Sequence, residues 1–151
     1  NWGTKHITAE DVYTEEKKYG REDEIHVTIK YGLHTANAKD VKNVLKNFGS
    51  FAITLGNISR FAPPDKEYDV VKLEVESPEL HKLHSLLGEK LENSDEWLEY
   101  RPHVTFAYIK KGTCSQLSGD DTFKGEKIKV EEITFSSKDG NKETIQLRKK
   151  V

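Results

Sequence analysis

One short phrase occurs in each half of the chain and constrains the fold more than any other feature. Residues 26–31 read His-Val-Thr-Ile-Lys-Tyr, and residues 103–108 read His-Val-Thr-Phe-Ala-Tyr. Successive side chains of an extended strand point to opposite faces of a sheet. The histidine and the threonine of each copy therefore share one face, with the valine on the other. Two such strands side by side would line a groove with two His-Thr pairs.

The same alternation predicts which residues of the two strands enter the core. Each copy ends in a tyrosine on the face of the valine, so Tyr31 and Tyr108 are expected in the core and not as stacking surfaces for a base. The polar face of the first strand, over residues 25–31, also carries Lys30.

Length and composition favour one globular domain over residues 1–151. Hydrophobic residues make up 34% of the 151 positions and charged residues 33%, which is enough for one core and too polar for a membrane protein. No apolar run approaches the roughly 18 residues of a membrane span, and the N-terminus has no signal-peptide pattern. We expect a soluble, cytoplasmic monomer.

The counts of particular residues limit partners and chemistry. Cys114 is the only cysteine, which excludes an internal disulfide and a cysteine-based zinc site. The formal charge of −2 argues against binding to duplex DNA but is compatible with a small phosphorylated ligand. The chain has no methionine, so we expect a processed protein or a piece of a longer one with neighbouring domains.

Two helices are predicted from capping residues and apolar spacing. Asn37 caps a helix that Gly49 ends, and Ser77-Pro78 begins a second helix of about four turns. Residues 1–24 are expected to be mostly irregular, and residues 93–102 to form a loop. The other predicted strands cover residues 51–61 with a kink at Gly56, 71–75, 128–135 with a phase shift at 131–132, and 144–148 after a turn at 138–141. This order predicts an α+β fold with mostly antiparallel sheet.

The two histidine-apolar-threonine-apolar motifs resemble those of the 2H phosphoesterases, the superfamily that includes 2′-5′ RNA ligases and cyclic phosphodiesterases. The resemblance covers about residues 25–110. It implies a bilobal fold with two main outer helices and a central groove. It also implies that His26, Thr28, His103 and Thr105 face this groove and act without a metal or another cofactor.

The phrases around the motifs are similar to versions of this domain in bacteriophage proteins. They are Tyr31-Gly32-Leu33-His34 and Tyr100-Arg101-Pro102-His103. This similarity raises the hypothesis that the domain degrades a host's 2′-5′ or cyclic oligonucleotide immune signal.

The residue types suit displacement at phosphorus independently of the family. Opening a cyclic phosphodiester requires a base for the nucleophile and an acid for the leaving alkoxide. Histidine has an ordinary pKa near 6.5, so one ring can be neutral while the other is protonated, and each proton transfer is worth about 10²–10⁴-fold. Threonine hydroxyls can donate to the non-bridging oxygens. The sequence does not assign the acid and the base.

Four cations are candidates for contacts with the phosphate, although a solvated surface position is the default for each in a chain with 24 basic residues. They are Lys30, Arg101, Lys110 and Arg60. The spacing of His81 and His84 on the second helix would also allow a metal site, but no third ligand is evident, so surface or packing roles are favoured.

Three functions remain open from the sequence. The first is a metal-independent phosphodiesterase for a small nucleotide or short oligoribonucleotide. The second is a module of the same fold that binds a nucleotide without turnover. The third is a metal-dependent hydrolase that uses the histidines as ligands.

Overall fold

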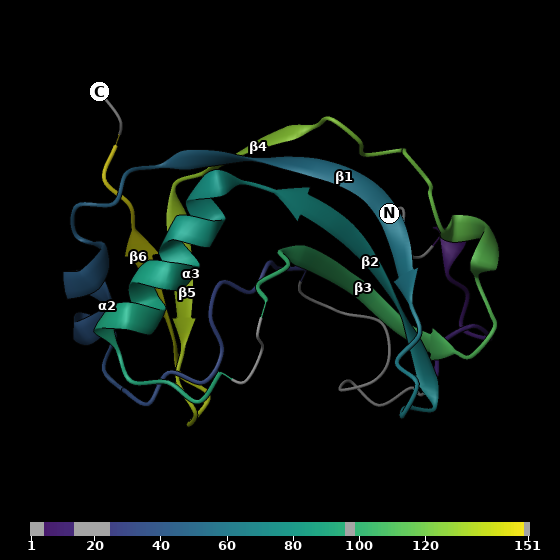
Figure 1. Cartoon of the computed structure of the whole chain (residues 1–151), viewed down its shortest axis with the longest axis horizontal. Helices are drawn as coiled ribbons and strands as arrows, with labels where there is room; N and C mark the ends of the chain where they lie inside the picture. The colour runs from purple at the N-terminus through teal and green to yellow at the C-terminus, as the bar shows by residue number, and fades with distance from the viewer. Residues whose placement is uncertain (1–4, 14–24, 96–98, 150–151) are drawn as a thin grey trace. The chain divides into compact units, whose positions relative to one another are not determined.

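The computed structural model describes residues 5–13, 25–95 and 99–149, so parts of the predicted irregular segment 1–24 and of the loop 93–102 lie outside the described residues. The described elements, labelled in Figure 1, are α2 (Ala38–Leu45), β1 (Phe51–Phe61), β2 (Tyr68–Glu76), α3 (Pro78–Lys90), β3 (His103–Lys110), a 3₁₀ turn (Ser115–Leu117), β4 (Lys127–Val130), β5 (Glu132–Ser136) and β6 (Lys142–Gln146). One sheet has the order β3-β2-β1-β4, and β5 pairs with β6 in a second sheet. The β1–β4, β2–β3 and β5–β6 pairs are antiparallel. The predicted α+β fold is therefore confirmed.

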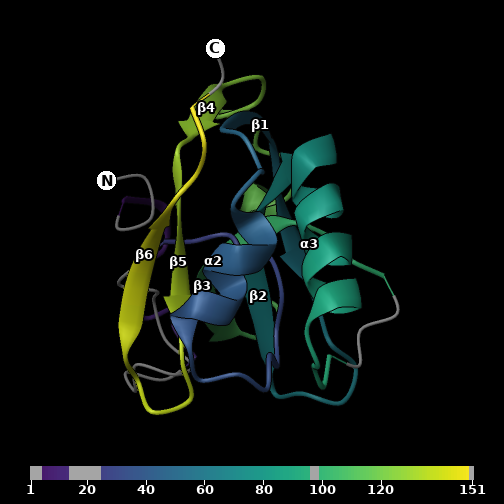
Figure 2. The ribbon, with the colours of Figure 1, turned by 90° about the vertical axis from the view of Figure 1, so that its left-hand side faces the viewer.

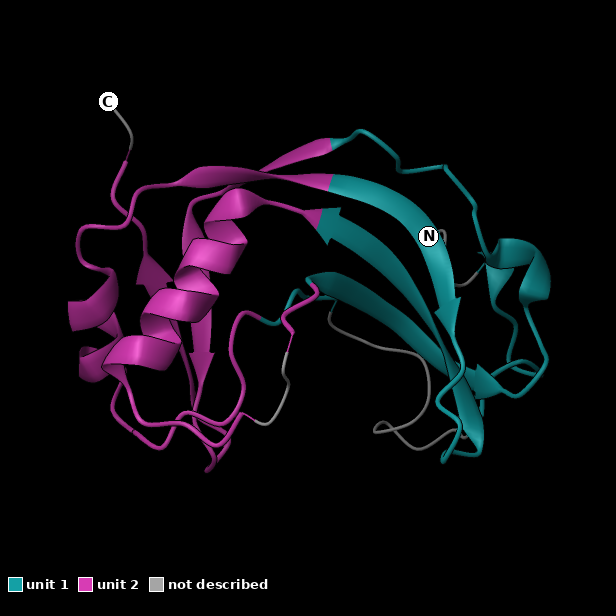
Figure 3. Ribbon diagram, viewed as in Figure 1, with its two compact units in different colours: residues 1–28, 55–75, 102–126 teal, residues 29–54, 76–101, 127–151 magenta. Residues whose placement is uncertain are grey.

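The chain divides into two compact units, coloured separately in Figure 3. Unit 1 contains residues 1–28, 55–75 and 102–126. Unit 2 contains residues 29–54, 76–101 and 127–151. Both histidine-threonine pairs belong to unit 1, whereas both long helices belong to unit 2. No helix in the described part of the chain is long and apolar enough to cross a membrane.

The helices of unit 2 begin at the predicted capping residues. The side chain of Asn37 accepts a hydrogen bond from the Lys39 amide at 2.9 Å, and the hydroxyl of Ser77 accepts one from the Leu80 amide at 3.3 Å. These side chains satisfy amides that the first helical turn leaves without partners. The apolar stripe predicted for α3 is also buried, since Leu83 is 0% exposed. In Figure 2, α2 and α3 lie beside each other in this unit.

The first helix is shorter than predicted. It ends at Leu45, four residues before Gly49, which we expected as its C-terminal cap. The Phe48 amide donates to the Leu45 carbonyl at 2.8 Å, so the chain turns away from the helix axis there. The Phe48 ring then packs edge-on against Phe51, with 5.9 Å between ring centroids. This aromatic contact replaces the continued helix.

The predicted strand over residues 128–135 is two strands in different sheets. β4 pairs with β1 through Phe51 and Val130, and β5 pairs with β6 through Ile133 and Ile145. Glu131 separates them, where the sequence indicated only a phase shift. The prediction was wrong because alternation shows which side chains are buried but not which strand is the partner.

The core face of unit 1 is formed by alternate residues of β2 and β3. Val71 and Leu73 are buried opposite Ala107 and Val104. In β1 the buried residues Leu55 and Ile58 are separated by the half-buried Gly56 and Asn57, so the alternation of burial changes phase where the kink was predicted. The other face of these strands carries the polar residues that define the candidate site.

The first copy of the repeated phrase does not form the predicted strand over residues 25–31. Its only ladder contact in the described structure is an isolated antiparallel bridge between Val27 and Val104. Ile25 and Tyr31 are 54% and 57% exposed, so the prediction that Tyr31 enters the core was wrong. Among the described residues this segment has no extended ladder beyond the bridge, so its side chains have no sheet face to bury. The chain then turns at Gly32, whose φ is 71°.

A β-bulge explains a second error in the predicted core. Val71 pairs with Ala107 and Lys72 pairs with Thr105, so Phe106 is an extra residue on β3. The extra residue reverses the alternation, because Phe106 and Ala107 are both buried. Tyr108 therefore lies opposite Val70, on the face of Thr105, and not in the core with Val104.

Candidate functional site

The isolated bridge fixes the register between the two copies of the phrase. Val27 lies opposite Val104 in an antiparallel bridge, and extending this register by one residue on each side places His26 opposite Thr105 and Thr28 opposite His103. Directly opposed residues share a face and have Cβ atoms about 4.5–5.5 Å apart, while diagonal neighbours are about 7–8 Å apart. The two histidines therefore occupy one diagonal of a four-residue array and the two threonines occupy the other.

Burial separates the two faces of this array. Val104 is 6% exposed, whereas Thr28, His103 and Thr105 are half-buried and His26 is exposed. We call the face of unit 1 that carries the four polar residues the motif face. Imidazole and hydroxyl groups meet there at the edge of a sheet whose other side is apolar core.

The central strand β2 adds a charged pair to the motif face. In the β2–β3 ladder Lys72 lies opposite Thr105 and Glu74 lies opposite His103. One row across the strands is therefore His26, Thr105 and Lys72, and the next row is Thr28, His103 and Glu74. The Lys72 ammonium lies 3.4 Å from the Glu74 carboxylate.

A residue of β1 fixes the position of the Glu74 carboxylate. The Ser59 hydroxyl donates to its Oε1 atom at 2.6 Å. Gly56 leaves the necessary space, because a Cβ atom at that position would be 3.2 Å from the Glu74 Cβ. Strand β1 thus anchors the acidic member of the charged pair.

Aromatic rings continue the motif face beyond Thr105. Tyr108 packs edge-on against Tyr68 at 5.1 Å between centroids, and Tyr68 packs against Tyr13 at 5.6 Å. Tyr13 is fixed by its amide, which donates to the Tyr108 carbonyl at 2.9 Å, and by its hydroxyl, which donates to Glu67 at 3.0 Å. The bulge at Phe106 is what brings Tyr108 to this cluster.

The four cations suggested for phosphate contacts differ in their positions. Arg60 forms an ion pair with the buried Asp69, on the core face of β2. Lys110 is exposed at the last position of β3, opposite Tyr68, so it lies on the same side as Tyr108 at the end of the motif face. The other two belong to unit 2, where Lys30 pairs with Asp95 at 3.2 Å and Arg101 pairs with Glu99 at 3.0 Å.

The histidines of α3 have packing partners inside unit 2. His84 shares a 2.8 Å hydrogen bond with the Ile29 carbonyl through Nδ1 and stacks on Tyr100 at 4.2 Å. His81 meets the same ring edge-on at 5.3 Å. Burial, followed by the charge of Tyr31, raises the pKa of Tyr100. In the described ranges, no three His, Cys, Asp or Glu side chains gather as a metal-ligand group.

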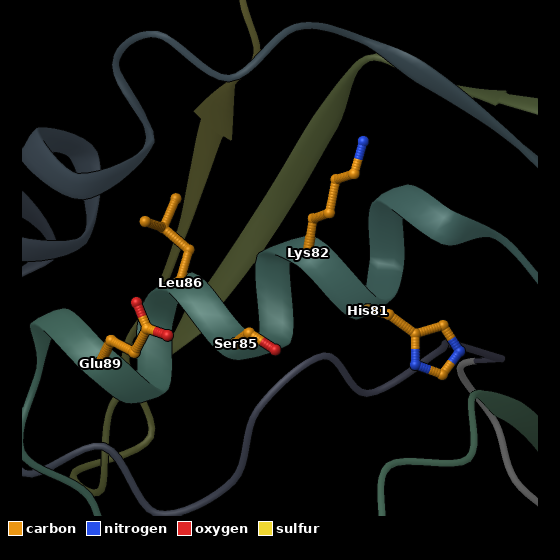
Figure 4. Close-up of a pocket in the computed structure, with 5 residues that line it drawn as sticks. All are labelled: His81, Lys82, Ser85, Leu86 and Glu89. Atoms are coloured by element: carbon orange, nitrogen blue, oxygen red, sulfur yellow. The ribbon is translucent and has the colours of Figure 1, made fainter.

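A hollow along α3 is a separate surface feature. Figure 4 shows its lining residues, which all project from this one helix: His81, Lys82, Ser85, Leu86 and Glu89. None of them belongs to the repeated phrase, and the hollow lies in unit 2. It therefore contributes no residue to the motif face.

Comparison with protein families agrees with the geometry. The family model of the 2′-5′ RNA ligase superfamily matches residues 6–142, which include both histidine-threonine pairs. The chain belongs to this superfamily. The match confirms the resemblance to 2H phosphoesterases and supports phosphoester chemistry in general terms. Among curated proteins, no sequence matches the chain.

The superfamily motif led to the four predicted residues, but the sequence did not point to their neighbours. Lys72 and Glu74 were recognisable as the polar side of a strand, and nothing local linked that strand to the second motif. Tyr108 was assigned to the wrong face because the extra residue at Phe106 has no sequence signature. The missing signal in each case is the strand register, which is set by contacts distant in sequence.

Proposed function

We propose that the protein is a metal-independent phosphodiesterase of the 2H type. Its substrate is a small ribonucleotide phosphodiester that involves a 2′-oxygen, namely a 2′,3′-cyclic phosphate, a 2′-5′ link or a cyclic signalling nucleotide. The observation that carries this proposal is the array on the motif face, where His26 and His103 occupy opposite corners. The superfamily match supports the reaction class, and the part of the proposal about the 2′-oxygen rests on that family alone.

The proposed reaction uses the two imidazoles as acid and base. One neutral ring removes a proton from the attacking water as the new P–O bond forms. The other ring, protonated, gives its proton to the leaving alkoxide oxygen as the old P–O bond breaks. In the reverse direction the two roles exchange. His26 and His103 fit these roles because diagonal positions approach a central phosphorus from opposite sides.

Thr28 and Thr105 supply the other two corners of the array. Their hydroxyl groups donate to the non-bridging oxygens of the phosphate, where a hydrogen bond to a charged group contributes about 1.5–3 kcal/mol. Each threonine lies directly opposite the histidine of the other motif. The threonines would thus orient the phosphate, while the two histidines flank it on the sides where the P–O bonds form and break.

The deciding experiment incubates the purified protein with a substrate panel in excess chelator. The panel contains 2′,3′-cyclic nucleotides, 2′-5′ oligoadenylates, cyclic dinucleotides and a plain phosphomonoester, and the products are separated by chromatography. We expect cleavage of at least one phosphodiester class, unaffected by the chelator. The cyclic and 2′-5′ members also test the hypothesis of an immune-signal substrate.

Other results would identify a different function. Micromolar binding without cleavage would favour the nucleotide-binding module. Loss of turnover in chelator, restored by zinc or manganese, would favour the metal-dependent hydrolase. A preference for the phosphomonoester would refute the two-histidine mechanism.

A further inference from the structure

Lys72 lies on the motif face in a setting unlike that of a solvated surface lysine. Its side chain is only 18% exposed, and it occupies the middle strand of unit 1, directly opposite Thr105. The ammonium lies 3.4 Å from Glu74 and 5.7 Å from the centroid of the Phe61 ring. The flexible four-carbon stem of lysine allows the ammonium to move from these partners to a ligand above Thr105.

Phe61 is an aromatic ring exposed on the same face. It is 51% exposed at the last position of β1, and its contact with Lys72 places it on the motif face. The neighbouring Arg60 points to the opposite face, where it pairs with Asp69. Burying the exposed Phe61 ring would stabilise the protein, yet the ring contacts the ammonium group of Lys72.

The two side chains complement two parts of one nucleotide. A phosphate bound by Thr105 would lie in the same row as Lys72, and an ammonium group is a suitable counter-charge for it. An aromatic ring can stack on any nucleobase, because every base has a π-face. The ammonium rests over the Phe61 ring, so its movement to a phosphate would free that ring for a base.

We propose that Lys72 and Phe61 form a nucleotide subsite beside the motif face, in which Lys72 binds the phosphate and Phe61 stacks on the adjoining base. The subsite rests on the proposed function for the identity of its ligand, a ribonucleotide. Glu74 is a positioning residue in this subsite: anchored by Ser59, it holds Lys72 on the face while no ligand is present.

The test measures binding of two probes, so it does not depend on turnover. Inorganic phosphate reports on Lys72 alone, and adenosine 2′-monophosphate reports on both residues. Affinities are measured by calorimetry for the wild type, Lys72→Met and Phe61→Ala. Lys129→Met is the matched control, because Lys129 forms a similar ion pair with the residue two positions later in the chain, Glu131, at 3.2 Å, and is 70% exposed in unit 2.

Lys72→Met should weaken both probes by about tenfold or more, as expected for the loss of a charged contact to phosphate. Phe61→Ala should weaken the nucleotide by about fivefold to a hundredfold and leave inorganic phosphate within about twofold. Lys129→Met should change neither. If Phe61→Ala proves unstable in a thermal melt, Phe61→Tyr should bind the nucleotide like the wild type and Phe61→Leu should not.

Three outcomes overturn the subsite. Lys72→Met binding both probes like the wild type would remove the phosphate role. Equal weakening of both probes by Phe61→Ala would show that the ring only supports the lysine. Absence of wild-type binding at millimolar probe would exclude the subsite altogether. Failure of the proposed function would appear in a different assay: the substrate panel would show no turnover, while the binding differences between the variants would persist.

Discussion

Replacing Asp69 by asparagine should destabilise unit 1 strongly, although the two side chains have the same shape. Asp69 is 2% exposed and accepts hydrogen bonds from the Gly112 amide at 3.0 Å and from Lys111 at 3.3 Å, in addition to its ion pair with Arg60. Asparagine would remove the charge and turn an NH₂ group towards these donors. Arg60 lies near the end of β1, and Lys111 and Gly112 lie in the turn after β3, so the carboxylate ties these two segments together.

The size of the effect follows from the burial of each partner. Removing one member of a buried ion pair costs about 3–5 kcal/mol, because the other charge stays buried. Arg60 is 20% exposed, and its Nε atom has no hydrogen-bond partner among the described residues. The Arg60 charge would therefore have few groups to stabilise it once the Asp69 carboxylate is removed. Lys111 is 44% exposed and can return to water. We therefore expect a loss of about 3 kcal/mol, at the lower end of this range.

Burial raises the pKa of Asp69, but the Gly112 amide, Lys111 and Arg60 outweigh this effect and lower it overall. A carboxylate with a lowered pKa stabilises the fold above its unfolded pKa of about 3.9, and this contribution is lost as pH falls through the lower folded pKa. The difference between wild type and Asp69→Asn should therefore be complete near neutral pH and shrink below about pH 4.

Urea and thermal unfolding at pH 7 and at pH 3 measure this prediction. A loss of about 3 kcal/mol corresponds to a fall in melting temperature of roughly 6–12 °C for a chain of this size. Asp121→Asn in an exposed loop should change stability by less than about 0.5 kcal/mol, and Lys111→Met by less than about 1 kcal/mol. A loss below 1 kcal/mol for Asp69→Asn, or one that grows in acid, would refute the reasoning.

Further predictions concern the motif face and the buried thiol. His26→Ala and His103→Ala should each reduce turnover by about 10²–10⁴-fold. The double variant should be little slower than the slower single variant, because acid and base act together. Rate measurements that show full activity in either single variant would contradict this prediction. The wild-type rate should show a bell-shaped pH profile, and a flat profile from pH 5 to 9 would exclude the two-histidine mechanism. Thr28→Val and Thr105→Val should each lower kcat/KM by about tenfold or more while the melting temperature changes little, and an unchanged kcat/KM would remove the hydroxyl from the site. Burial, followed by the charge of Asp11, raises the pKa of Cys114. Its thiol should therefore react with a chromogenic disulfide much more slowly in the native protein than in urea. Similar reaction rates in both conditions would show that the thiol is accessible.

The sequence predicted those features that depend on near neighbours in the chain. Asn37 and Ser77 act as caps through amides two or three residues away, so their sequence context was sufficient. The histidine and threonine of each motif were placed on one face by alternation alone. The shared face of each histidine and its threonine is therefore the part of the site that the sequence predicts, whereas their arrangement across the Val27–Val104 bridge depends on distant pairing.

Features that depend on distant pairing could not be predicted. The isolated Val27–Val104 bridge replaces a full strand, and the bulge at Phe106 moves Tyr108 to the motif face. Lys72 became a candidate only when the ladder placed it opposite Thr105. In each case the deciding partner lies tens of residues away, and hydrophobic alternation holds no information about it.

The bridge between the two copies of one phrase has a consequence for symmetry. An antiparallel pair of identical segments is related by a local twofold rotation axis, which passes between Val27 and Val104 perpendicular to the sheet. A phosphorus atom on this axis would meet equivalent groups from both sides, so the array by itself does not distinguish the acid from the base. Lys72 and Glu74 break the equivalence, because β2 flanks only the second copy. Which histidine acts as the acid and which as the base would then be decided by the strand beside the repeat and by the substrate, not by the repeat itself.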